Sequence, residues 1–155
     1  SFGINKTIGD LAGPMAFAIL MGSSRAFYGK FGDKINLERF MQYSAVLCMV
    51  SYLMIAFIPV PALGILGCAV CGLSVGIMWP GTFSMAAASV KRGGTALFAL
   101  LALAGDVGCS SGPTYVGMIS GALNDNLKLG IFAALIFPVL MIMGIKMIGS
   151  LQKYD

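Results

Sequence analysis

The sequence has no histidine and little charge of either sign. Of its 155 residues, only ten are Lys or Arg and six are Asp or Glu, whereas 58% are hydrophobic and the mean hydropathy is +0.90. Such a chain lacks the polar side chains that cover the surface of a soluble globule. We therefore expect an integral membrane protein with a single domain.

These absences exclude several classes of membrane protein. Zinc proteases of the His-Glu-x-x-His type and serine–histidine proteases both need the missing histidine. An intramembrane aspartyl protease needs two membrane aspartates, one of them in Gly-x-Gly-Asp, but Asp106 follows Leu103-Ala-Gly and Asp10 lies at a membrane edge. No Gly-x-x-x-x-Gly-Lys-Ser/Thr motif is present, which argues against an ATP-driven pump. We expect no enzymatic activity, no metal and no cofactor.

Cysteine and basic residues add no further chemistry. The four cysteines lie in apolar runs, where they serve as small packing residues, and they form no disulfide framework. Cys68 and Cys71 have the spacing of a redox motif, but no polar neighbour activates a thiol there. The net charge of +4 comes from basic residues scattered singly. This pattern does not favour a nucleic-acid partner.

Five apolar runs divide the chain, and each is long enough to cross a membrane. A helix needs about 20 residues to span a hydrocarbon core of roughly 30 Å, and the third and fourth runs exceed this enough to indicate a tilt or a kink. The sequence therefore predicts an all-α, polytopic transmembrane bundle. The expected spans are residues 9–30, 40–58, 62–89, 94–123 and 129–149.

The basic residues predict the orientation, because cytoplasmic loops collect Lys and Arg. Eight basic residues fall on one side of the expected topology and two on the other. The eight are Arg25, Lys30, Lys34, Arg39, Lys91, Arg92, Lys146 and Lys153, and the two are Lys6 and Lys128. We expect a multi-pass protein of the cell (inner or plasma) membrane, with residue 1 outside and the C-terminus cytoplasmic.

Small residues recur at four-residue spacing within the spans, which lets helix backbones approach closely. Plain helix packing explains most of these glycines, and helix deformation during gating is the alternative. Pro80 and Pro113 favour deformation, because a proline inside a helix removes a backbone hydrogen bond. The pairs are Gly72 and Gly76, Gly108 and Gly112, and Gly117 and Gly121. Gly76 and Gly81 around Trp79-Pro80 make a pliable point.

Asp106 is the most informative polar residue, since an ionisable group within a span is costly and usually faces a cavity or a partner. It lies about 12 residues, or roughly 18 Å, into its span. Ser110 shares its helical face, and Pro113 and Gly117 continue the stripe. Asp106 binds a coupling proton, a cation or a substrate, or else it forms a structural hydrogen bond.

Two further residues, Asp10 and Trp79, have two interpretations each. Asp10 heads a stripe that offers a pathway across the membrane, although capping of the helix is the simpler role. The stripe continues through Pro14, Phe17, Met21, Ser24 and Tyr28. Trp79 anchors the chain at the interface or walls a binding cavity. Arg25 lies near the cytoplasmic end of its span and can snorkel.

The loop after the first run carries a recognisable pattern. Residues 25–39 hold six of the sixteen charged residues, with Gly29 followed four residues later by Asp33-Lys34. This resembles the loop signature of the major facilitator superfamily, Gly-x-x-x-Asp-Arg/Lys-x-Gly-x-Arg/Lys-Arg/Lys, in its weaker second copy. Asn36 replaces the second glycine and Glu38 replaces the first residue of the final basic pair.

The order of the motifs extends the resemblance over the whole chain. Residues 108–117 are similar to the glycine–proline helix signature of that family, and Gly72-x-x-x-Gly76-x-x-Trp79-Pro80 precedes them. By this resemblance the chain corresponds to spans eight to twelve of twelve. It begins at Ser1 without a charged leader, so we expect a fragment whose N-terminal half is missing.

The resemblance implies a secondary active transporter that moves a small solute by alternating access, coupled to an ion, most simply a proton. It implies that Gly29, Asp33, Lys34 and Arg39 form a conformational latch, although Lys30 and Arg39 also fit a solvated topogenic loop. The implied partners are a small-molecule substrate, a coupling ion, membrane lipid and the missing half. A non-transporting membrane scaffold or assembly subunit is the alternative.

Overall fold

The protein folds into helices throughout the described part of the chain. The computed structural model describes residues 6–58, 60–90 and 93–151. Its elements are α1 (Lys6–Phe31), the short 3-10 helix η1 (Gly32–Lys34), α2 (Leu37–Phe57), α3 (Pro61–Val75), α4 (Met78–Ser89), α5 (Gly94–Ala122), α6 (Leu127–Ala133) and α7 (Ile136–Leu151). The all-α prediction is confirmed.

Four helical segments of the described chain are long and apolar enough to cross a membrane. They are Leu37–Phe57, Ala62–Ser89, Gly94–Ala122 and Leu127–Ser150. Their bounds agree with the last four expected spans to within a few residues. The first expected span corresponds to α1, which is long enough at 26 residues but is not among these four. The fold is therefore that of an integral membrane protein.

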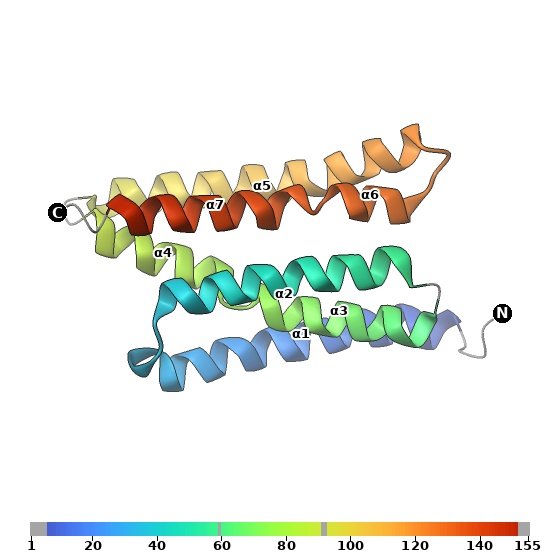
Figure 1. The fold of residues 1–155 in the computed structure, drawn as a ribbon, viewed down its shortest axis with the longest axis horizontal. Helices are drawn as coiled ribbons and strands as arrows, with labels where there is room; N and C mark the ends of the chain where they lie inside the picture. Colours follow the sequence, from blue (N-terminus) through green and yellow to red (C-terminus); the bar gives the residue numbers. More distant parts are fainter. Residues whose placement is uncertain (1–5, 59, 91–92, 152–155) are drawn as a thin grey trace.

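Successive spans run in opposite directions, so α1 and α3 are parallel to each other and antiparallel to α2 (Figure 1). α1 packs on α3, α3 packs on α2, and α2 reaches across to α6 and α7, while α5 packs on α6. The η1 turn, the end of α4 and the end of α7 lie at one end of the bundle, and the turns after α2 and α5 lie at the other. The basic segment around Lys34 and the residue Lys146 therefore belong to the same half of the bundle. Lys91, Arg92 and Lys153 lie outside the described residues.

Two of the spans are broken, and each break precedes a proline. α3 ends at Val75 and α4 begins at Met78, with Pro80 as its third residue; α6 ends at Ala133 and α7 begins at Ile136, with Pro138 as its third. A proline is tolerated in the first turn of a helix because the N–H it lacks has no intrahelical partner there. The pliable point around Trp79-Pro80 is thus a break, whereas Pro113 lies inside the continuous helix α5.

A buried apolar cluster lies near the end of the bundle that carries η1. Met41 of α2, Met85 of α4 and Ile145 of α7 are buried against one another, and Leu37, Met141 and Ile148 pack around them. At this end Gly149 of α7 leaves room for the carboxylate of Glu38. Many large apolar side chains elsewhere are exposed, which lipid accommodates.

Close packing of α1 on α3 depends on two glycines. A Cβ atom on Gly72 would overlap the backbone of Phe17, and one on Gly76 would lie 2.8 Å from the carbonyl oxygen of Met21. The expectation that small residues let helices approach is confirmed for this pair. It does not extend to α5, because Cβ atoms on Gly108, Gly112, Gly117 and Gly121 would meet nothing within 4 Å.

Candidate functional site

The polar face of α5 surrounds Asp106 near the middle of that helix. The Ser110 hydroxyl donates to the Asp106 carbonyl oxygen at 2.9 Å, and the Thr114 hydroxyl donates to the Ser110 carbonyl oxygen at 2.8 Å. These bonds satisfy the two hydroxyl donors within the helix. The carboxylate of Asp106 is exposed and has no partner in the part of the chain that the structure describes.

This face also lines an open hollow of about 670 Å³. Its lining residues all come from α5: Asp106, Val107, Ser110, Ser111, Thr114, Tyr115 and Met118. The predicted neighbours Asp106 and Ser110 are therefore brought together, while Pro113 and Gly117 do not line the hollow. Carboxylate and hydroxyl oxygens on one side of such a hollow suit a polar solute or a cation.

Trp79 links the broken span to α5. Its ring occupies the space where Gly105 has no side chain, next to Asp106 in sequence. The ring also packs on Phe83 at 4.8 Å between centroids, and Phe83 stacks on Phe98 of α5 at 5.7 Å. Trp79 is 47% exposed, so it is a partly open wall between α4 and α5.

The break in the span between α3 and α4 has a partner on α1. The Nε of Arg25 donates a hydrogen bond of 3.0 Å to the carbonyl oxygen of Gly76. In an unbroken helix this carbonyl would accept from residue 80, but Pro80 has no N–H. Arg25 therefore does more than snorkel, because it completes the backbone hydrogen bonding of another span.

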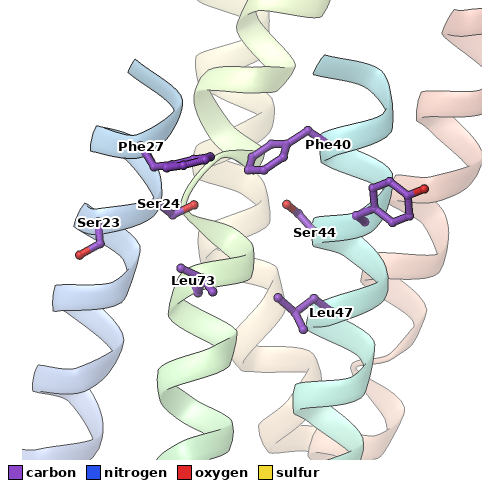
Figure 2. Close-up of a pocket in the computed structure, with 8 residues that line it drawn as sticks. Ser23, Ser24, Phe27, Phe40, Ser44, Leu47 and Leu73 are labelled. Carbon is purple, nitrogen blue, oxygen red and sulfur yellow. The ribbon is translucent and has the colours of Figure 1, made fainter. Parts of the chain in front are cut away.

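A second hollow, of about 520 Å³, lies between α1, α2 and α3 (Figure 2). The hydroxyls of Ser24 and Ser44 point toward one another across it, beside the facing rings of Phe27 and Phe40 and with Leu47 and Leu73 on their other side. Both serines are buried. Facing hydroxyls among rings and leucines suit a mainly apolar molecule with one hydrogen-bonding group.

The four residues of the predicted latch lie where α1 turns into α2. Gly29 is in the last turns of α1, Asp33 and Lys34 are in η1, and Arg39 is in the first turn of α2. Asn36 caps α2, because its side-chain oxygen accepts from the backbone N–H of Arg39 at 3.1 Å. Asn36, one of the two residues that differ from the signature that this loop resembles, thus caps the next helix. Lys34 and the Arg39 side chain are exposed, and the side chain of Asp33 lies outside the described part.

The middle of the stripe that begins at Asp10 packs against another helix. Phe17, Met21 and Ser24 lie against α3, where they meet the positions of Gly72 and Gly76. The small residues of α3 thus bring this part of α1 into a packed interface, while Ser24 and Tyr28 each also line a hollow, so the pathway stays a prediction. Asp10 is in the first turns of α1, and its side chain lies outside the described part.

Sequence reasoning missed the second hollow and the Arg25–Gly76 contact. Ser24 was named only as a member of the stripe from Asp10, and Ser44 gives no signal, since isolated serines are common in apolar helices. Only the acceptor of the Arg25–Gly76 contact could be predicted, because Pro80 leaves the Gly76 carbonyl without its helical donor. The donor was not predictable without knowing that α1 packs on α3.

The chain was compared with protein families, curated proteins and solved structures. No family model matches the chain, and no similar curated protein or solved structure was found.

Proposed function

We propose that this protein is part of a secondary active transporter that moves a small solute by alternating access, coupled to an ion gradient, most simply of protons. The observation that carries this proposal is the polar face of α5. A carboxylate within a span is costly unless it faces water or a partner. The Asp106 carboxylate has neither an ion pair nor a hydrogen bond in the described chain, and it borders the open hollow on α5.

The broken span supports the same function. Transporter sites are commonly formed by discontinuous helices, whose irregular backbone is tolerated where it borders a cavity. Here Trp79, directly before Pro80, packs on Gly105 directly before Asp106. A movement of the α3–α4 break would therefore shift the Trp79 ring against Gly105, beside the Asp106 carboxylate.

The resemblance to the major facilitator superfamily belongs to this proposal. It would make Gly29, Asp33, Lys34 and Arg39 a latch on the cytoplasmic face. Gly76, Pro80, Gly108, Gly112, Pro113 and Gly117 would then be the points where spans bend. The preceding spans would supply the other wall of the α5 hollow, which consists only of α5 residues here.

Access to α5 from both sides of the membrane tests the proposal without knowledge of the solute. In a variant without native cysteines, Ser110→Cys should react with a charged, membrane-impermeant thiol reagent in both right-side-out and inside-out vesicles. Met143→Cys is the control, because Met143 is 61% exposed but lies on the strongly apolar helix α7. A non-transporting scaffold would cover α5 with protein, so Ser110→Cys would react from neither side.

Asp106→Asn then tests the coupling role. The substitution removes the charge and keeps the size of the side chain. Proton uptake driven by a panel of solutes should be lost in vesicles that contain Asp106→Asn. It should persist with Asp125→Asn, which changes a carboxylate in the turn between α5 and α6. Equal uptake in both variants would reduce Asp106 to a packing role.

A further inference from the structure

A separate hollow of about 290 Å³ lies beside the α3–α4 break. Arg25, Tyr28 and Gly29 of α1 line one side, and Ile77, Trp79 and Pro80 line the other. Each of its three polar side chains has an N–H or O–H to donate: a guanidinium, a phenol hydroxyl and an indole N–H. No acidic side chain lines it.

The guanidinium of Arg25 has spare donors in a fixed position. Its Nε is held by the Gly76 carbonyl at 3.0 Å, while the two terminal nitrogens have no hydrogen bond or ion pair in the described chain. A guanidinium presents these N–H groups as a planar fork that matches the oxygens of a phosphate or carboxylate. Its positive charge disfavours a cation in the hollow.

The two aromatic donors are held in place by their own contacts. Tyr28 stacks on Phe40 with ring centroids 5.8 Å apart, and Gly32 leaves room for its ring. Trp79 packs on Phe83 and fits against Gly105. Because these contacts already restrict both rings, a bound ligand loses less side-chain entropy in ordering them.

We propose that this hollow binds an oxyanion of the phosphate class, either the headgroup of an anionic lipid or a free phosphate. The oxygens would accept from the Arg25 fork, the Tyr28 hydroxyl and the Trp79 indole. A bound phosphate would tie α1 to α4 across the break. The hollow is distinct from the α5 face, and the proposal does not depend on transport.

Trp79 makes the test direct, because it is the only tryptophan of the chain. Its emission is recorded in the whole protein in neutral detergent during three titrations: with inorganic phosphate, with phosphatidylglycerol and with phosphatidylcholine of the same chain length. A saturable change with phosphate alone assigns a free anion. A saturable change with phosphatidylglycerol, but with neither phosphate nor phosphatidylcholine, assigns a lipid headgroup.

Two variants and a control locate the ligand. Arg25→Gln should weaken binding about tenfold or more, as expected for the loss of charge-assisted hydrogen bonds. Tyr28→Phe removes only a hydroxyl and leaves the Arg25–Gly76 bond in place, so it should fold normally and weaken binding about threefold to tenfold. Lys146→Gln should have no effect, because this exposed cation on α7 does not line the hollow.

The proposal is overturned if neither phosphate nor phosphatidylglycerol gives a saturable change. It is also overturned if phosphatidylcholine binds as well as phosphatidylglycerol, if Tyr28→Phe binds as tightly as the unchanged protein, or if Lys146→Gln weakens binding as much as Tyr28→Phe.

Discussion

The Nε of Arg25 donates to the carbonyl oxygen of Gly76, 51 residues away in the sequence. Pro80 leaves this carbonyl without its helical donor, and an unpaired backbone group inside a membrane costs several kcal/mol. A side chain of one span therefore satisfies the backbone of another. The second proline break is different: the Ala134 carbonyl, which Pro138 leaves free, accepts locally from the N–H of Phe137 at 3.1 Å. Only the first break depends on a tertiary contact.

A double-mutant cycle measures this dependence. Arg25→Met leaves the Gly76 carbonyl unpaired and should lower the free energy of unfolding by about 1–3 kcal/mol. Pro80→Ala supplies a backbone N–H to the same carbonyl, so Arg25→Met should cost at least about 1 kcal/mol less in that background. Reversible unfolding in detergent gives the four free energies. Effects that add within about 0.5 kcal/mol would show that the two residues do not share the carbonyl.

Gly72→Ala tests the α1–α3 interface. The added methyl group would overlap the backbone of Phe17, which cannot rotate away, so α1 and α3 must separate. We expect a loss of about 1–3 kcal/mol in the free energy of unfolding. Gly64→Ala in the same helix is the matched control, since a Cβ atom there meets nothing within 4 Å. Equal stability of the two variants would contradict the close packing.

Prediction from sequence succeeded for features that depend on local composition. The last four spans were placed to within a few residues because run length alone decides whether a helix can cross a membrane. The chemistry of proline predicted a pliable point around Trp79-Pro80, where the structure has a break. The same reasoning applied to Pro138 would have located the second break, but it does not distinguish Pro113, which lies inside the continuous helix α5. Sequence did not reveal which glycines are in contact: Gly72 and Gly112 have the same spacing pattern, yet only Gly72 meets a neighbouring helix.

The same limit applies to the candidate sites. Asp106 and Ser110 were paired correctly because helical periodicity places them on one face. Ser24 and Ser44 face one another from different helices, which no local pattern encodes (Figure 2).

Gly105→Ala should disturb Trp79. A Cβ atom on Gly105 overlaps the indole ring, so the ring must leave its place between Phe83 and α5. We expect a shift in the emission maximum of this single tryptophan. Gly108→Ala on the same helix meets nothing within 4 Å and should leave the emission unchanged. Identical spectra for Gly105→Ala and the unchanged protein would mean that the ring does not contact α5.

Labelling of single cysteines tests both the bundle and its orientation. Lys34 in η1 and Asn124 in the turn after α5 are exposed at opposite ends of the bundle (Figure 1), so reagents added to one side of the membrane should reach only one of them. The native cysteines must be replaced first, because Cys109 is exposed.

The excess of basic residues near Lys34 favours the cytoplasmic side. In intact cells an impermeant thiol reagent should therefore modify Asn124→Cys, and Lys34→Cys should react only after permeabilisation. The reverse pattern would invert the orientation and leave the fold intact, whereas modification of both positions from one side would contradict the antiparallel bundle itself.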